Sequence, residues 1–171
     1  MPDNILETAR LDFRELDAED APFILQLVNE PGWLRFIGDR GIRTLEAASN
    51  YILDGPVAMY RRLGFGLWLV ERKEDKLPIG ICGLIKRDTL ADIDLGFAFL
   101  SAHHRQGYAF EAATATMAHA RKALGFTRLV AVVSPDNEGS CGLLEKLGFD
   151  LEQMIRLSED APPIKLYATR L

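Results

Sequence analysis

The sequence contains few of the residues that mark disulfide-rich or metal-binding proteins. Of its 171 residues only two are cysteines and three are histidines, and two of the histidines are adjacent. Cys82 and Cys141 lie in apolar stretches typical of a strand and a helix, so we expect reduced thiols in the core rather than a disulfide. The histidines lack the spacing of a metal site, and we expect no metal.

Long apolar runs and an excess of positive charge are also missing. No run approaches the roughly 20 apolar residues that a membrane helix needs. The first residues, Met-Pro-Asp-Asn, carry an acid where a secretory signal carries basic residues, so we expect a cytoplasmic protein without a membrane partner. The net charge of −5, from 20 Lys+Arg against 25 Asp+Glu, argues against a nucleic-acid partner and is compatible with a cationic substrate.

The order of hydrophobic patterns predicts a single α/β domain over residues 1–171. Alternating or continuous apolar stretches predict strands at residues 10–16, 65–72, 79–86, 92–100, 129–133, 149–156 and 164–169. Apolar spacings of three and four residues, with capping and breaking residues at the ends, predict helices at 17–29, 44–63 (bent at Gly55-Pro56), 106–124 and 138–147. We expect residues 33–43 to form a loop rich in aromatic and basic side chains.

The segment 104–113, His-Arg-Gln-Gly-Tyr-Ala-Phe-Glu-Ala-Ala, joins a predicted strand to an Ala-rich helix. Unpaired N–H groups converge at a helix start, and the helix dipole adds positive potential there. Side chains larger than those of Gly107 and Ala109 would keep the backbone away from a phosphate. The segment therefore predicts a site for a diphosphate-bearing cofactor, although close packing of helix on sheet would also favour small residues.

The pattern His104-x-x-Gly107-x-Ala109 after a strand resembles the acyl-CoA pyrophosphate loop of the GNAT (GCN5-related) N-acetyltransferases, which reads Arg/Gln-x-x-Gly-x-Gly/Ala. His104 stands where Arg or Gln is usual. Residues 134–140 and 144–149 are similar to the late segment of that family, where an Asn-x-x-Ser helix start precedes Glu-Lys-x-Gly-Phe. Residues 8–14 resemble the start of the branch that includes the ribosomal-protein N-terminal acetyltransferases, and residues 36–44 resemble bacterial members with no assigned substrate. The resemblance covers essentially the whole chain.

The resemblance implies a GNAT fold: a mixed, mostly antiparallel central sheet of about seven strands flanked by four helices, with a splayed strand pair at the cofactor site. It also implies an N-acetyltransferase that uses acetyl-CoA. A primary amine, on a small molecule or a protein N-terminus, would attack the thioester directly in a ternary complex. We expect a monomer or a homodimer. A non-catalytic acyl-CoA sensor on the same fold is the alternative, whereas the lack of a Gly-x-x-x-x-Gly-Lys-Ser/Thr loop argues against a nucleotide-phosphate enzyme.

By resemblance, three segments would contact the cofactor: the strand before the loop, the loop with its helix start, and the start of the late helix. The residues concerned are Phe97, Ala98, Phe99, His104, Arg105, Gln106, Gly107, Tyr108, Ala109, Phe110, Asn137 and Ser140. Asn137 is also a good helix N-cap, which would account for it without a ligand.

Acetyl transfer needs a neutral amine and a proton for the departing thiolate. Asp94 lies on the same strand face as Asp92 and matches the position of an acid often seen in relatives, so it is the candidate general base. A strand acid that only solubilises the surface is the alternative, and Glu71 and Asp88 are weaker candidates. Ser140 is the candidate acid.

Tyrosine serves as that acid in many relatives, but none occurs between Tyr108 and Tyr167. For the acceptor amine, the stretch between the first two predicted helices offers a pocket rim. Its candidate residues are Trp33, Arg35, Phe36 and Arg40, together with Arg43. A loop that packs its own aromatic side chains would show the same composition.

Overall fold

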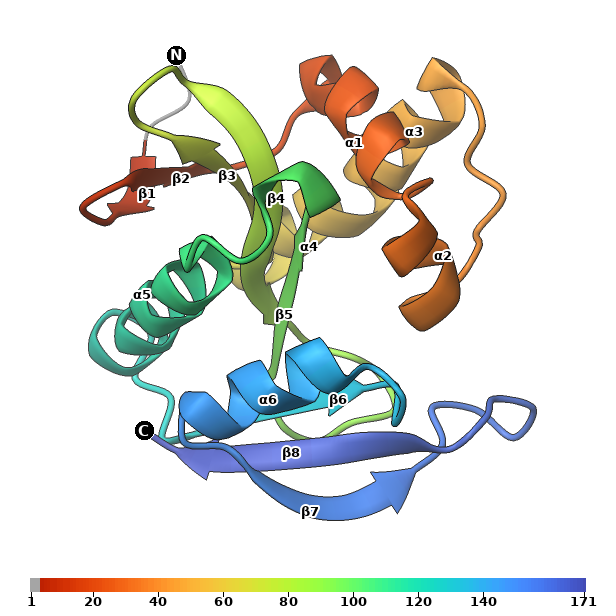
Figure 1. Cartoon of the computed structure of the whole chain (residues 1–171), viewed down its shortest axis with the longest axis vertical. Helices are drawn as coiled ribbons and strands as arrows, with labels where there is room; N and C mark the ends of the chain where they lie inside the picture. Colours follow the sequence, from red (N-terminus) through yellow and green to blue (C-terminus); the bar gives the residue numbers. More distant parts are fainter. Residues whose placement is uncertain (1–3) are drawn as a thin grey trace.

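The computed structural model describes residues 4–171, and its centre is an eight-stranded sheet in the order β1-β2-β3-β4-β5-β6-β8-β7 (Figure 1). Neighbouring strands are antiparallel except β5 and β6, which are parallel. The strands are β1 (Asn4–Glu7), β2 (Leu11–Arg14), β3 (Leu67–Arg72), β4 (Leu77–Ile85), β5 (Asp94–Phe99), β6 (Arg128–Val133), β7 (Asp150–Ile155) and β8 (Ile164–Arg170). The mixed, mostly antiparallel sheet expected from the resemblance is confirmed.

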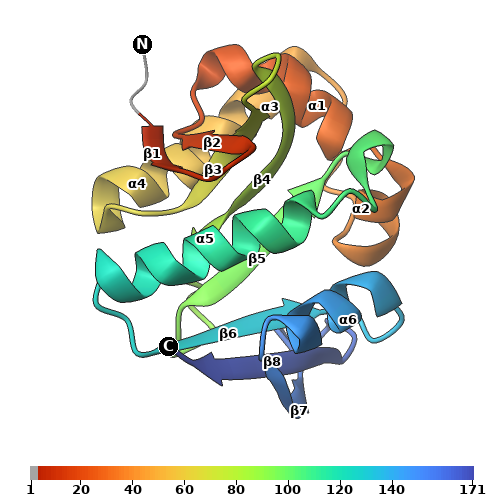
Figure 2. The ribbon, with the colours of Figure 1, turned by 60° about the vertical axis from the view of Figure 1, so that its left-hand side comes forward.

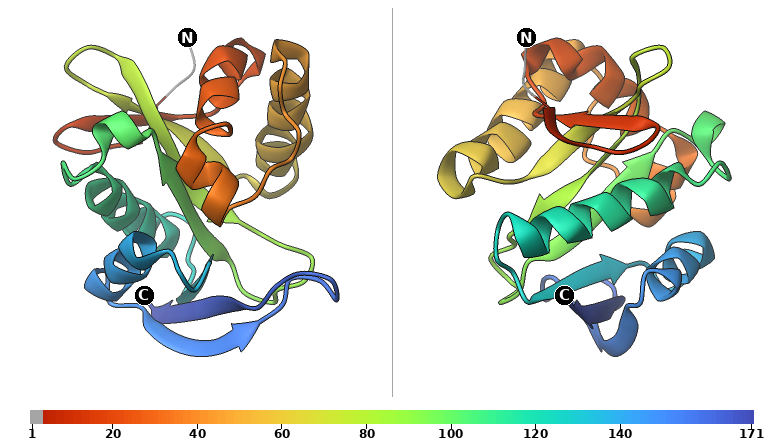
Figure 3. Two further views of the ribbon diagram at one scale, coloured as in Figure 1. Left: turned by 45° about the vertical axis from the view of Figure 1, so that its right-hand side comes forward. Right: turned by 90° about the vertical axis from the view of Figure 1, so that its left-hand side faces the viewer.

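Helices cover both faces of this sheet. The chain forms α1 (Ala21–Leu27), α2 (Pro31–Phe36), α3 (Leu45–Ile52), a π-helical turn (Leu53–Val57), α4 (Ala58–Leu63), α5 (Tyr108–Lys122) and α6 (Glu138–Lys146). Figure 3 shows α5 across one face and α1 to α4 on the other. Within β3, Trp68 and Val70 belong to the core under α5, whereas Leu69 belongs to the core under α1 and α3. The two cores follow from the alternation of side chains along a strand.

The prediction of a loop at residues 33–43 was partly wrong, because residues 31–36 form α2. Pro31 does end the preceding helical stretch, but it also occupies the first turn of the next helix, where its missing N–H group costs nothing. At Gly55-Pro56, where a bend was expected, a π-helical turn interrupts the α-helix. β1 was not predicted; it pairs with β2 and adds the eighth strand.

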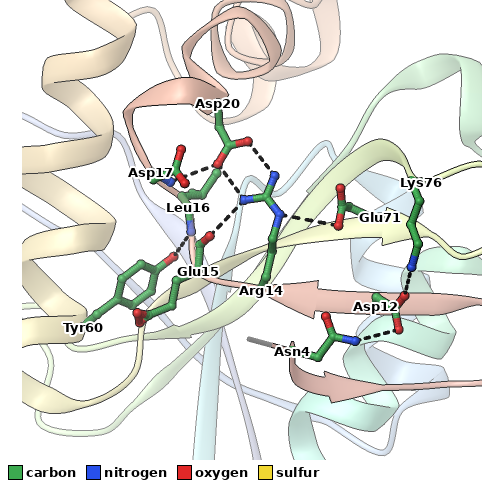
Figure 4. Close-up of polar contacts among 10 residues, drawn as sticks. All are labelled: Asn4, Asp12, Arg14, Glu15, Leu16, Asp17, Asp20, Tyr60, Glu71 and Lys76. Carbon is green, nitrogen blue, oxygen red and sulfur yellow. Dashed lines mark hydrogen bonds and ion pairs between the residues drawn. The ribbon is translucent and has the colours of Figure 1, made fainter. Parts of the chain in front are cut away.

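Ion pairs fix the chain as it leaves β2 (Figure 4). The Arg14 guanidinium lies 2.8 Å from the Asp20 carboxylate and 3.5 Å from the Glu71 carboxylate. Asp20 also accepts a hydrogen bond from the Asp17 backbone N–H, closing a capping box around the 3-10 turn (Ala18–Asp20) that leads into α1. These contacts hold α1 against β2 and β3.

β5 and β6 diverge, and this divergence positions the site. β5 pairs with β4 along its whole length, from Asp94 opposite Ile85 to Phe99 opposite Gly80. With β6 it shares one residue pair, Asp94 opposite Val130, next to a hydrogen bond of 2.9 Å from the Val130 N–H to the Ile93 carbonyl. Beyond this pair the strands separate, between α5 and α6 (Figure 2). The splayed strand pair implied by the resemblance is therefore present.

Candidate active site

Two cavities meet where β5 and β6 separate, one of about 580 Å³ and one of about 280 Å³. The larger lies toward the start of α5, and the smaller lies toward Asp94 and the α2–α3 segment. Both are of a size that can hold small ligands or parts of them. Both are lined by Trp33, Phe36, Ile37, Phe97, Ala98, Asn137 and Ser140. A ligand in one cavity would therefore meet a ligand in the other at the junction of β5 with α2 and α6.

The start of α5 lines the larger cavity. Gly107 is the N-cap residue with φ of +80°, a left-handed conformation that favours glycine, and no side chain caps the helix. The first residues of the helix, Tyr108, Ala109 and Phe110, line the same cavity. The N–H groups of a first helical turn have no partner within their own helix, so this end of α5 suits an anion.

Basic side chains surround this helix start. His103, His104, Arg105 and Lys146 line the larger cavity, and the Lys146 ammonium lies 4.3 Å from the centre of the Phe110 ring. Sequence reasoning missed Lys146, because nothing in the local pattern of α6 distinguishes it from a solvated lysine.

His104 uses its ring within the protein. Its Nε2 atom lies 2.8 Å from the Phe99 carbonyl oxygen, so the imidazole links the loop to the end of β5. Gln106 was predicted to contact the cofactor, but among the described residues it lines neither cavity. Its carbonyl oxygen instead accepts a hydrogen bond of 2.9 Å from Arg10.

The open edge of β5 faces the junction. Because the Ile93 carbonyl points to β6, strand alternation turns the backbone polar groups of Phe97 and Phe99 the same way, and those of Ala98 toward β4. β6 has diverged at this level, so Phe97 is free to pair with an extended ligand. The Phe99 carbonyl is already taken by His104.

Asp94 is buried at the base of the smaller cavity, with 1% of its surface exposed. Its Oδ2 atom lies 2.7 Å from Arg87 Nε, and its buried Oδ1 atom has no hydrogen-bond partner within the described part of the chain. Burial raises the pKa of Asp94 to about 6, against the opposing effects of the Arg87 guanidinium and of the nearby Val132 backbone N–H. A solubilising role for Asp94 is excluded by this burial. Glu71 and Asp88 line neither cavity among residues 4–171.

Asn137 and Ser140 stand at the start of α6. The Asn137 Oδ1 atom accepts a hydrogen bond of 3.2 Å from the Ser140 N–H, so Asn137 is the N-cap of α6. Both residues also line both cavities. The cap and a ligand contact are therefore compatible.

Only some of the residues predicted for the acceptor rim line the cavities. Trp33 and Phe36 line both cavities, and Arg40 lines the smaller one, with its guanidinium 5.5 Å from the centre of the Tyr51 ring. Arg35 lines neither cavity of the described chain; it lies 3.6 Å from Asp136 and stacks on Phe36. The wall also includes Arg87 and Tyr51, which were not predicted as site residues.

Arg43 is outside both linings too, because it pairs with Asp39 at 2.7 Å and binds Asn29. Residues 4–171 contain no group of three or more His, Cys, Asp or Glu side chains placed to hold a metal ion. Cys82 and Cys141 are buried free thiols. In the same part of the chain, no helix is both long and apolar enough to cross a membrane.

The comparisons with known proteins agree with this geometry. Residues 10–150 match the family model of the acetyltransferase (GNAT) domain, so the chain belongs to the GNAT family of acetyltransferases. It is an acyl-CoA-dependent acetyltransferase. It is 33% identical over 155 residues to the uncharacterized N-acetyltransferase YoaA of Bacillus subtilis, covering 89% of this chain and 86% of the relative.

Solved structures share the fold. An acetyltransferase from Agrobacterium tumefaciens superposes with a TM-score of 0.81 at 26% identity, over 96% of this chain and 92% of that one. RimL, a ribosomal alpha-N-protein acetyltransferase solved in complex with coenzyme A, superposes with a TM-score of 0.76 at 16% identity, over 99% and 98% of the two chains.

Proposed function

We propose that this protein transfers an acetyl group from acetyl-CoA to a primary amine by direct attack in a ternary complex. The observation that carries the proposal is the junction of the two cavities. One cavity contains an uncapped helix start among basic side chains, and the other contains a buried carboxylate with an unpaired oxygen. A thioester in the first and an amine in the second would meet beside Ser140.

The larger cavity fits CoA by the chemistry of its lining. The N–H groups from Gly107 to Phe110 would bind the pyrophosphate, with charge from Arg105 and Lys146. The free backbone groups of Phe97 suit an amide of the pantetheine arm, as a strand-like pairing. The Asn137 side chain, which also caps α6, would contact the same arm. RimL in its complex with coenzyme A supports this choice of ligand for the fold.

Two side chains would handle the protons. Asp94 would accept a proton from the acceptor ammonium, because its Oδ1 atom is unpaired and its raised pKa leaves it ionised but basic at neutral pH. The neutral nitrogen then bonds to the thioester carbon as the carbon–sulfur bond breaks. The Ser140 hydroxyl would pass a proton to the leaving sulfur and regain one from the nitrogen that has formed the amide.

The acceptor is a primary amine on a small molecule or a protein N-terminus. Trp33, Phe36 and Arg40 would form its binding wall. The smaller cavity, at about 280 Å³, has room for little more than the amine-bearing end of an acceptor. RimL acts on a ribosomal protein, which makes peptides with free N-termini the first acceptors to test.

Thiol release from acetyl-CoA tests the proposal. The purified chain is incubated with acetyl-CoA and a panel of small amines, polyamines and peptides, with N-terminally blocked peptides as matched controls. We expect release that depends on a free amine, with the acetyl group recovered on nitrogen. Tight CoA binding without turnover on any acceptor would favour an acyl-CoA sensor. Protection against heating by ATP but not by CoA would contradict the cofactor itself.

A further inference from the structure

The turn between β1 and β2 is bound to the start of α5 by side chains about 100 residues away in sequence. The Glu111 carboxylate accepts hydrogen bonds from the Thr8 hydroxyl, from the Arg10 backbone N–H at 3.1 Å and from Arg10 Nε at 2.7 Å. Glu111 lies in the first turn of α5. The N-terminal hairpin therefore reaches the helix start that lines the larger cavity.

The Arg10 side chain contacts the loop itself. Its Nη1 atom donates a hydrogen bond of 2.9 Å to the Gln106 carbonyl, and its guanidinium lies 4.3 Å from the centre of the Tyr108 ring. A Cβ atom added to Gly107 would lie 3.3 Å from Arg10 Nη2. One guanidinium thus packs against three consecutive residues of the loop.

The bond to Gln106 fixes the direction of the next N–H group. In a trans peptide the carbonyl and the following N–H point in opposite directions. With the Gln106 carbonyl held toward Arg10, the Gly107 N–H points away from Arg10. Gly107 lines the larger cavity, whereas Arg10 and Gln106, among the described residues, do not. The orientation of this donor toward the cavity therefore depends on Arg10.

Arg10 also cancels a charge that opposes anion binding. Burial favours the neutral form of Glu111, but the hydrogen bonds from Thr8 and Arg10 outweigh burial and lower the pKa of its carboxyl group. Glu111 is thus an anion within one turn of the helix start. Without the Arg10 guanidinium, its charge would repel a phosphate bound there.

We propose that Arg10 is a positioning residue for the pyrophosphate of CoA: it sets the Gln106–Gly107 peptide and neutralises Glu111, acting through the loop and not by touching the ligand. This inference rests on the proposed use of the larger cavity for CoA. It gives the β1–β2 hairpin a part in cofactor binding.

The experiment compares acetyl-CoA with S-acetylpantetheine, a thioester with the same pantetheine arm that lacks the pyrophosphate and the 3′-phosphoadenosine attached to it. For Arg10→Met we expect the KM for acetyl-CoA and the Kd for CoA to rise about tenfold or more. This is the size of one lost charge-assisted hydrogen bond, here from the Gly107 N–H to the pyrophosphate. The kcat/KM for S-acetylpantetheine and the KM for the acceptor should stay within about twofold of wild type.

Two further variants separate the two parts of the role, and a third is the control. Arg10→Lys keeps the charge but loses the planar fork, so it should recover only part of the affinity for CoA. Glu111→Gln added to Arg10→Met should recover the part that is due to charge. Arg128→Met is the matched control, because Arg128 is also half-exposed and ion-paired, to Asp92 and Glu152, but lies beyond the opposite end of α5. It should leave the Kd for CoA unchanged.

An equal loss for both thioesters, or an unchanged Kd for CoA in Arg10→Met, would overturn the role of Arg10. If Arg10→Met does not fold, the ratio of the two thioesters in Arg10→Lys decides the question in the same way. Failure of the wild-type chain to bind CoA in calorimetry would instead contradict the proposed function. The two failures are thus distinguishable.

Discussion

Replacing Asp94 with asparagine removes one buried charge and leaves the side-chain shape nearly unchanged. Burial raises the pKa of Asp94 from 3.8 to about 6, and a shift of about two pH units corresponds to roughly 3 kcal/mol between the two protonation states. If the carboxylate is the general base, wild-type kcat/KM should rise about tenfold per pH unit up to about pH 6 and then level off. Asp94→Asn should lose this inflection and fall roughly 10²- to 10⁴-fold in rate.

The same shift has a consequence for stability. The folded-state pKa of Asp94 lies above its unfolded value, so its contribution to the free energy of unfolding is full below about pH 4 and is lost as the pH rises through about 6. The stability of wild type should therefore fall by roughly 3 kcal/mol relative to Asp94→Asn between these limits. Urea unfolding at pH 4 and pH 7 measures the difference.

The pH dependence of kcat/KM is measured as thiol release from acetyl-CoA between pH 5 and 8. The peptide acceptor has an N-terminus with a pKa of about 8, well above the expected inflection. Arg87→Met should move the inflection upward, because Arg87 lowers the pKa of Asp94. Asp92→Asn is the control, since Asp92 lies two residues earlier, in the bend before β5, and pairs with Arg128. A pH profile of Asp94→Asn that matches wild type would refute the assignment.

Three other substitutions test the loop, the acid and the sheet. Gly107→Val should weaken CoA binding at least tenfold in calorimetry. Gly125 also has a positive φ, of +73°, but open space around it, so Gly125→Ala controls for backbone strain of about 1 to 2 kcal/mol. Equal CoA affinity in Gly107→Val and wild type would exclude the phosphate loop. Ser140→Ala should lower kcat in the thiol-release assay without changing the Kd for CoA, and an unchanged kcat would exclude Ser140 as the acid. Gly83→Ala should lower the free energy of unfolding in urea by more than about 2 kcal/mol, because the new Cβ would lie 2.0 Å from the Gly66 carbonyl oxygen. The exposed Gly142→Ala, with nothing within 4 Å, should instead be neutral or stabilising, and similar behaviour of the two variants would contradict the close approach.

The elements with strong local patterns were predictable. The buried apolar runs of β3 and β4 and the small-residue stripe of α5 follow from the sequence pattern, and the loop at Gly107 follows from its place before a helix. α2 and β1 were not predicted. A proline occurs both just after the end of a helix and in the first turn of a helix, so Pro31 alone does not indicate that α2 begins there. Residues 4–7 are too short to show a period and gain their strand form from pairing with β2.

Within the site, local chemistry was predictable and long-range contacts were not. Asp94 stands out as an acid in a strand, but its burial and its ion pair with Arg87, in the β4–β5 connection, follow from the folded arrangement and not from the local pattern. The predicted roles of Gln106 and Arg35 assumed that polar residues near a ligand site face the ligand. Gln106 lines neither cavity of the described chain, and its backbone carbonyl accepts a hydrogen bond from Arg10, which lies 96 residues earlier. No periodic signal encodes such a pairing.

The separation of β5 from β6 also has a mechanical meaning. A full ladder resists widening, because every hydrogen bond would have to lengthen, but here the two halves of the sheet share one backbone rung at Asp94 and Val130. Asp94, the proposed base, belongs to that rung, so the rung fixes its position relative to β6. At the level of Phe97 no β5–β6 residue pair within residues 4–171 ties the two strands, and their separation there leaves the backbone edge of β5 open to a ligand.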